Sequence, residues 1–210
     1  MGKFGINPRN NLGLSVKDLR SIARDIGMNR ELAQQLWQTD IHDARMLAAL
    51  IADPRKVTEE QMEAWIKDVD SWDLCDMLCY HLFYKTSSAT KKIKEWTARS
   101  KEFVKRAGFV LIVALAVHDK TADDTLFESF LPIIKREISD DRNYVKKAVN
   151  WALRAIGKRN PYLHGKALQT AYDILKIDAK SAQWIARDAL RELHSEKVNK
   201  RLQRKKERQA

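Results

Sequence analysis

The sequence predicts an all-α protein, and three observations point that way. Glycine and proline are sparse, with 7 and 4 residues in a chain of 210. Apolar residues recur at the three- and four-residue spacing of one helix face, in runs separated by short breaks that begin with capping residues. No clear segment shows the strict alternation of apolar and polar residues that is typical of a half-buried strand.

Capping residues mark the expected helix starts. Ser15 is expected to cap the first helix, which ends before Gly27, and Asn29 to cap the second. Thr58 and Gln61 have the spacing of a capping box. The expected helices cover residues 15–26, 29–37, 41–52, 58–69, 71–84, 87–98, 102–117, 123–138, 142–156, 162–175 and 181–193. We assign residues 1–195 to a single domain and residues 196–210 to a frayed or exposed basic C-terminal extension.

A weak internal repeat indicates how these helices are arranged. Short similar pieces that contain Ala44, Ala107, Ala148 and Ala186 begin four apolar helical runs, and the last two gaps between them are 41 and 38 residues. A period near 40 with two helices per unit is the signature of HEAT-like repeats. We therefore predict a right-handed superhelical stack of antiparallel helix pairs with a concave basic groove, which such arrays use for binding. A plain helical bundle is the alternative.

The charge balance indicates a polyanionic partner. Lys and Arg number 39 against 28 Asp and Glu, a formal net charge of +11. The last fifteen residues account for +5 of it, so the body of the chain is basic as well. The alternative is a charge that serves solubility, together with a charged terminal helix.

The cysteines and the apolar runs indicate a cytoplasmic protein. Cys75 and Cys79 lie four residues apart, which suits neither a disulfide framework nor a four-ligand zinc site, so we expect core thiols in a reducing cytosol. The chain start has no apolar core of a signal peptide. The most apolar run, residues 107–117, is too short to span a bilayer.

One helix carries an unusual pair of side chains. Trp72 and Asp76 lie four residues apart, and so share one face of the helix that Asp70 or Ser71 caps. The rest of this helix is largely apolar, and a buried carboxylate is costly unless it is paired. Asp76 therefore has either a structural partner or a function.

Two later helices combine an indole with cations. Trp151 lies off the apolar stripe of its helix, beside Lys147 and Arg154. Trp184 repeats the pattern with Arg187 and Arg191. An exposed ring among cations suits nucleic acid, because the cations hold phosphates while the ring meets a base or sugar. The alternative is a tryptophan that covers a neighbouring helix.

Arg106 is a further candidate site residue, and the motifs of several common enzyme classes are absent. Arg106 lies among apolar residues and needs an acceptor, and a structural salt bridge with Asp76 is one interpretation. The chain has no P-loop, no nucleophile elbow and no Gly-rich dinucleotide motif. Its five histidines show no metal-ligand spacing. We therefore expect neither a metal nor a cofactor.

Taken together, these pieces resemble the bacterial DNA alkylation repair family, the AlkD-like DNA glycosylases built from HEAT-like repeats. The resemblance covers most of the chain, and the order and spacing of the pieces are more specific than any piece alone. The pieces are Phe4-Gly5-Ile6, Leu19-Arg20, Leu36-Trp37, Ile41-His42-Asp43-Ala44-Arg45, Ser71-Trp72-Asp73-Leu74-Cys75-Asp76, Phe103-Val104-Lys105-Arg106 and Asn150-Trp151-Ala152-Leu153-Arg154.

The resemblance implies a catalytic cleft made by Trp72, Asp76, Arg106 and Trp151. It implies double-stranded DNA with purines alkylated at N3 or N7 as substrate, and a monofunctional glycosylase acting as a monomer. A carboxylate would stabilise the positive charge that develops on the deoxyribose. Lys105 stands where a second arginine is typical and is expected to contact DNA. The alternatives are a non-catalytic DNA-binding protein and a protein-interaction scaffold on the same repeats.

Overall fold

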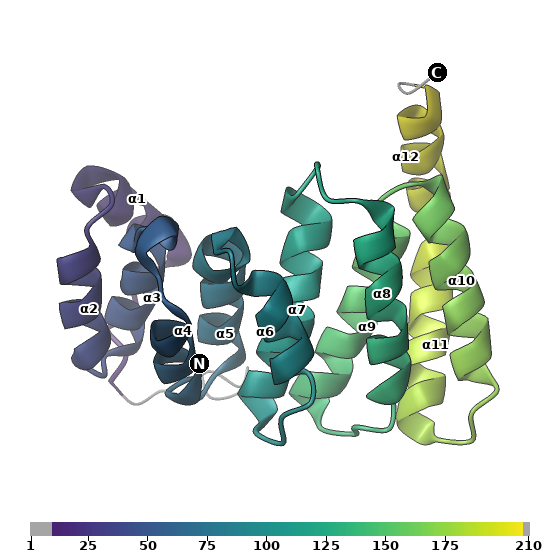
Figure 1. Ribbon diagram of the computed structural model, residues 1–210, viewed down its shortest axis with the longest axis horizontal. Helices are drawn as coiled ribbons and strands as arrows, with labels where there is room; N and C mark the ends of the chain where they lie inside the picture. The colour runs from purple at the N-terminus through teal and green to yellow at the C-terminus, as the bar shows by residue number, and fades with distance from the viewer. Residues whose placement is uncertain (1–9, 208–210) are drawn as a thin grey trace. The chain divides into compact units, whose positions relative to one another are not determined.

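The computed structural model describes residues 10–207, and every regular element within them is a helix (Figure 1). The all-α prediction is thereby confirmed. Phe4-Gly5-Ile6 and the last three residues of the chain lie outside the described residues. The α-helices are α1 (Val16–Ile26), α2 (Arg30–Gln38), α3 (His42–Ile51), α4 (Glu59–Lys67), α5 (Trp72–Met77), α6 (Ala89–Trp96), α7 (Glu102–His118), α8 (Asp124–Arg136), α9 (Asn143–Gly157), α10 (Pro161–Leu175), α11 (Lys180–Leu193) and α12 (Glu196–Glu207).

Helices α1, α2 and α4 begin at capping residues that the sequence predicted. The Asn29 side chain accepts a hydrogen bond from the Leu32 amide, and Thr58 accepts one from the Gln61 amide. Ser15 and Asp18 form a reciprocal capping box at the start of α1, which sequence analysis did not identify. These bonds satisfy amide groups that the first turn of a helix leaves without a helical partner.

One predicted helix is interrupted. Residues 71–84 were expected to form a single helix, but α5 ends at Met77 and continues as the π-helix η3 (Leu78–Leu82) and the 3-10 helix η4 (Phe83–Lys85). The expectation of one continuous helix was therefore wrong. The apolar residues of this run fit the pattern of an α-helix and of a π-helix alike. The sequence pattern therefore does not show whether a backbone amide bonds to the carbonyl four residues earlier, as in an α turn, or five residues earlier, as in a π turn. Single π turns often occur at functional positions.

The described chain forms two compact units, and the first ends at Lys92. In this unit α3 packs against α1, α2, α5 and η3. The rings of Trp37 and Trp65 stack with their centroids 4.3 Å apart, and the Trp37 indole donates a 3.0 Å hydrogen bond to Asp68. Both cysteines are buried in this core and form no disulfide, as predicted.

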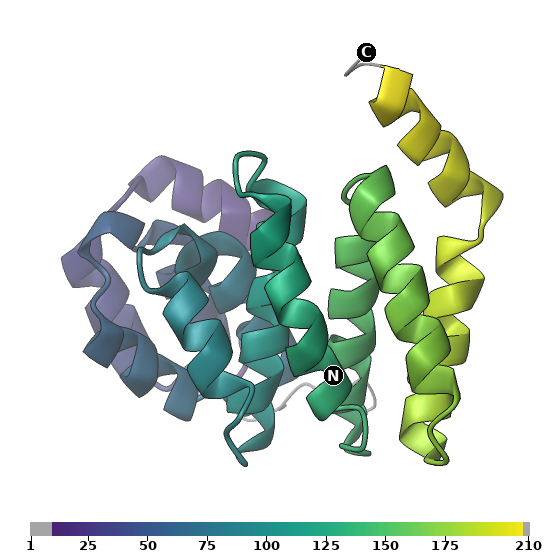
Figure 2. The same ribbon diagram turned by 45° about the vertical axis from the view of Figure 1, so that its right-hand side comes forward.

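The second unit begins at Ile93 and contains two layers of helices. The helices α7, α9 and α11 lie side by side in one layer, and α8 and α10 lie in the other (Figures 1 and 2). Ala107, Ala148 and Ala186, which define the sequence repeat, are fully buried in the first layer. Small side chains at these positions allow neighbouring helices to approach closely.

Helix α7 is the core helix of the second unit. All of its side chains from Arg106 to Ala116 are buried, and a helix that is apolar on nearly all sides is typical of a protein core. No helix within residues 10–207 combines the length and the apolar character needed to cross a membrane.

Two helical glycines give a matched test of this packing. A Cβ at Gly108 would lie 2.8 Å from the backbone nitrogen of Thr97, whereas a Cβ at Gly165 in α10 would meet nothing within 4 Å. We expect Gly108→Ala to destabilise the protein by about 1–3 kcal/mol because α7 is overpacked against the end of α6. We expect Gly165→Ala to stabilise it by about 0.5–1 kcal/mol. Urea unfolding of both variants measures the difference, and equal effects would contradict it.

Candidate functional site

Trp72 and Asp76 lie one turn apart on α5, at its first and fifth residues. Both side chains are half-buried, whereas Leu74, Cys75 and Met77 on the same helix are buried in the core. The indole and the carboxylate therefore share the face of α5 that is not used for core packing.

Tyr80 extends this face into η3. It is half-buried and follows Asp76 by four residues. Burial raises the pKa of the Tyr80 phenol, and the nearby negative charge of Asp76 raises it further. Sequence analysis did not single out Tyr80, although the four-residue spacing that linked Trp72 to Asp76 would have identified it.

An ion pair fixes the start of α5. The Asp73 carboxylate lies 3.0 Å from Nε2 of His42, the first residue of α3, and His42 is only 8% exposed. Burial opposes the charge of His42, but the hydrogen bond and the charge of Asp73 raise its pKa overall. Burial likewise opposes the charge of Asp73, and His42 lowers the pKa of Asp73 overall. The pair joins α3 to the turn that carries Trp72.

This pair predicts a pH-dependent stability. The contribution of His42 is complete below its unfolded pKa, near 6.5, and is lost as the pH rises through its raised folded pKa. The contribution of Asp73 is present above about pH 4 and is lost as the pH falls through its lowered pKa. We expect Asp73→Asn to lower the free energy of unfolding by about 1.5–3 kcal/mol near pH 5.5, and by less near pH 8.5.

The control is Asp25→Asn on the exposed side of α1, which removes the same charge without removing this pair. Urea unfolding at the two pH values measures both variants. A destabilisation by Asp73→Asn that is equal at both pH values would contradict the assigned ion pair.

Arg106 is held at the start of the buried part of α7. Its side chain is 5% exposed, and its Nη1 donates a 2.8 Å hydrogen bond to the carbonyl of Tyr144 in the first turn of α9. The rings of Phe103 and Tyr144 lie 5.6 Å apart and pack the same two helix ends together. A backbone carbonyl thus supplies an acceptor for the guanidinium, which the sequence indicated was needed but did not identify.

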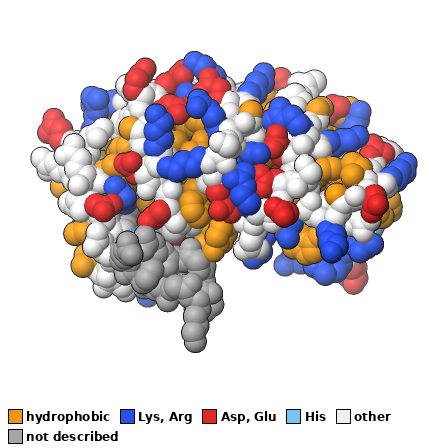
Figure 3. All heavy atoms as spheres, turned by 90° about the horizontal axis from the view of Figure 1, so that it is seen from below, with side chains coloured by type: hydrophobic (Ala, Val, Ile, Leu, Met, Phe, Trp, Pro, Cys, Tyr) orange, Lys and Arg blue, Asp and Glu red, His pale blue; other side chains and the backbone are white. Residues whose placement is uncertain are grey.

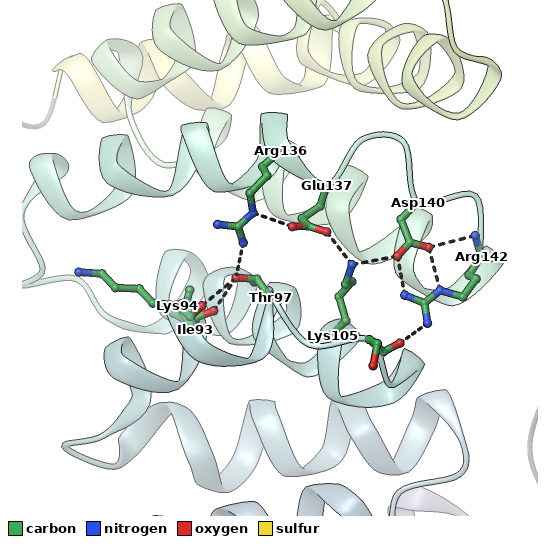
Figure 4. A network of polar contacts seen from close by, with 9 residues as sticks. Ile93, Lys94, Thr97, Lys105, Arg136, Glu137, Asp140 and Arg142 are labelled. Carbon is green, nitrogen blue, oxygen red and sulfur yellow. Dashed lines mark hydrogen bonds and ion pairs between the residues drawn. The ribbon is translucent and has the colours of Figure 1, made fainter.

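Lys105, the neighbour of Arg106, is the centre of an ionic network (Figure 4). Its ammonium lies 2.6 Å from Glu137 and 3.2 Å from Asp140, and its side chain is 12% exposed. Arg142 holds Asp140 from the other side at 2.5 Å. The network ties the start of α7 to the connection between α8 and α9. This placement favours a structural role for Lys105 over the DNA contact that we expected from the sequence.

A substitution separates these two roles. We expect Lys105→Met to lower the free energy of unfolding by about 1.5–3 kcal/mol, because two largely buried carboxylates lose their shared cation, although Arg136 and Arg142 still hold one of them each. Lys147→Met, on the exposed side of α9, is the control and should leave stability within about 0.5 kcal/mol. Denaturant unfolding gives both values. Unchanged stability in Lys105→Met would contradict the structural role and would favour the DNA contact expected from the sequence.

Helix α9 presents Trp151 half-buried and Lys147 exposed, with its predicted apolar stripe in the core. Arg154, expected to contact DNA, forms an ion pair with Glu192 of α11 and lies 3.9 Å from Asp188. Its charge is therefore partly used to join α9 to α11.

Trp184 lies on the exposed side of α11 with 40% of its surface accessible. The ammonium of Lys146, from α9, lies 5.1 Å from the centre of its ring, a cation–π contact. Sequence analysis missed Lys146 because spacing along one helix does not show which residue of another helix faces it. The ring borders an open hollow of about 410 Å³, which is lined by Lys180, Gln183, Trp184, Arg187, Asp188 and Arg191.

The surface seen in Figure 3 carries charges of both signs. Lys and Arg side chains lie among Asp and Glu side chains, with apolar patches between them. On this face the Lys and Arg side chains therefore form small separate groups and not one continuous basic patch. Within residues 10–207, no three His, Cys, Asp or Glu side chains are grouped in a way that could hold a metal ion.

Comparison with known proteins identifies the family. A family model described as DNA alkylation repair enzyme matches residues 1–193. The chain belongs to this family. Two uncharacterized Listeria proteins, Lin0241 of Listeria innocua and Lmo0209 of Listeria monocytogenes, are each 25% identical to it over 168 residues. The matched region covers 79% of this chain and 73% of each relative.

A solved structure shares the fold. It belongs to a new family of proteins related to the HEAT-like repeat DNA glycosylases with affinity for branched DNA structures. The match has a TM-score of 0.73 at 23% identity and covers 90% of this chain and 85% of the other. The HEAT-like repeat fold predicted from the sequence is thereby confirmed.

Proposed function

We propose that this protein is a monofunctional alkylpurine-DNA glycosylase that hydrolyses the N-glycosidic bond of N3- or N7-alkylated purines in double-stranded DNA. One observation carries the proposal: in a chain of the DNA alkylation repair family, Asp76 and Trp72 occupy the half-buried face of α5 outside the core. A carboxylate retained beside an indole at such a position suits a substrate that becomes cationic.

The chemistry of the substrate explains why a carboxylate is sufficient. A purine alkylated at N3 or N7 already carries a positive charge, so it leaves as a neutral base without a strong general acid. As the bond from C1′ to the base nitrogen breaks, positive charge builds on the deoxyribose, and Asp76 stabilises it electrostatically. Water then adds to C1′ and gives its proton to Asp76 or to solvent. This route needs no amine nucleophile and no cofactor.

The other proposed site residues hold the substrate. In the first unit, Trp72 contacts the sugar or the cationic base through its ring, and such a contact contributes about 0.5–2 kcal/mol. In the second unit, Trp151 is a further candidate for a ring contact with the DNA. Arg106 binds a phosphate next to the lesion. The hydrogen bond from its Nη1 to the Tyr144 carbonyl fixes the position of this guanidinium on α7.

Exposed cations supply the remaining DNA affinity. Lys147, Arg187 and Arg191 are exposed in the second unit, and Trp184 offers a ring on which a base or sugar can pack. Arg154 contributes only in part because it is paired with Glu192, and Lys105 is left out of the contact set. Such contacts give an affinity that depends on salt and little on sequence.

Release of bases from methylated DNA tests the proposal. We expect the wild-type protein to free N3-methyladenine or N7-methylguanine. We expect Asp76→Asn to lower the rate of release about 10²–10³-fold, because the variant no longer stabilises the positive charge of the transition state. DNA affinity should be nearly unchanged. Asp70→Asn, an exposed position just before α5, makes the same charge change and should keep the wild-type rate.

Two outcomes would contradict the proposal. A wild-type rate in Asp76→Asn would remove this residue from the mechanism. Binding of DNA without release of any alkylated base by the wild-type protein would support the second candidate, a non-catalytic DNA-binding protein. That candidate is favoured by the affinity for branched DNA structures of the structurally similar family.

A further inference from the structure

Helix α12 carries a dense group of cations that are not part of the proposed glycosylase site. Its twelve residues contain six Lys and Arg against two Glu. An open hollow of about 560 Å³ on this helix is lined by Lys197, Lys200, Arg201, Arg204 and Lys205. The two apolar residues of the helix, Val198 and Leu202, are buried against the protein. The basic side chains therefore lie on the opposite, exposed face of the helix.

The helix is docked on the second unit by its buried stripe and by a lysine. The ammonium of Lys205 donates hydrogen bonds to the carbonyls of Lys158, at 3.2 Å, and Arg159, at 2.5 Å, which follow the end of α9. Of the two alternatives expected for this extension, frayed or exposed, residues 196–207 match the second: they form a regular helix with exposed basic side chains. The last turns of α12 extend beyond the ends of α10 and α11 (Figures 1 and 2).

The cations around α12 exceed the local acids. Burial lowers the pKa of Lys205 to about 8, and the charges of Arg201, Lys120 and Arg159 add to this effect. Lys200 forms an ion pair with Glu196, whereas Arg201 and Arg204 form no salt bridge with any residue that the structure describes. Like charges held together in this way repel one another, and a bound anion would relieve the repulsion.

We propose that α12 forms a second DNA-binding surface, one that holds the phosphate backbone of duplex DNA with residues other than those assigned to base release. The choice of DNA as the anion rests on the proposed function. From Lys197 to Lys205 the helix rises about 12 Å, which corresponds to three or four phosphates of one strand. The cations are therefore spread over the length of a polyanion instead of being gathered around one phosphate. A membrane surface does not fit, because an interfacial helix needs exposed apolar residues, and those of α12 face the protein.

The salt dependence of binding to an undamaged DNA duplex tests the surface. The test variant is Arg201→Gln with Arg204→Gln in the full chain, which keeps Val198, Leu202 and Lys205 for docking. We expect the slope of log K against log salt concentration to become shallower by about 1.8, which is 0.9 for each phosphate that the variant no longer neutralises. The charge-preserving variant Arg201→Lys with Arg204→Lys should keep the wild-type slope.

A second control removes equal charge elsewhere on the same unit. Lys135 and Lys176 both lie near Asp173, on α8 and just after α10, and their double substitution by Gln should leave the slope unchanged. The inference is overturned if the α12 variant keeps the wild-type slope, if the control changes the slope as much, or if the wild-type protein does not bind the duplex at about 50 mM salt.

The two proposals fail separately. If Asp76→Asn abolishes base release while the α12 variant keeps the full slope, the glycosylase stands and the second surface does not. If no base is released by the wild-type protein while the α12 variant has the shallower slope, the second surface stands and the glycosylase does not.

Discussion

Asp76 is a charged side chain on a helix whose other residues are largely packed in the core. The surrounding structure has to hold this carboxylate at the edge of the core. Removing a carboxylate from water is costly, so a half-buried position on a short, well-anchored helix is the compromise. The anchor is the ion pair of Asp73 with His42, and the π turn that follows brings Tyr80 close to the same charge. The proposed chemistry uses this compromise, because a carboxylate that is partly removed from water acts more strongly on a developing positive charge.

The basic character of the chain is divided between structure and surface. Lys92, Lys105, Arg154 and Arg159 are used internally, where each bonds carboxylates or carbonyls that belong to other parts of its own unit. Exposed cations remain on the outer sides of α9, α11 and α12. The formal charge of +11 therefore overstates what a DNA molecule would meet, and the positions of the exposed cations matter more than their number.

Local chemistry explains which features could be predicted from the sequence. Caps such as Ser15, Asn29 and Thr58 act within one turn, so the starts of these three helices followed directly from residue types. The buried alanines Ala107, Ala148 and Ala186 recur at gaps of 41 and 38 residues and indicated the repeat. Features that depend on a second helix were missed: the acidic partners of Lys105 and Arg154 lie 32 or more residues away along the chain, where spacing within one helix does not show them. The docking of α12 was missed because Val198 and Leu202 make too narrow an apolar stripe to predict burial.

The role of Asp76 as a charge opposite a cationic sugar is tested most directly by binding of transition-state mimics. A DNA duplex with a positively charged pyrrolidine in place of the damaged nucleotide mimics the cationic sugar, and a tetrahydrofuran at the same position is its neutral counterpart. We expect the wild-type protein to bind the cationic duplex at least about 10²-fold more tightly, as transition-state analogues are bound. Asp76→Asn should bind the two equally. An undiminished preference in Asp76→Asn would contradict the assigned role.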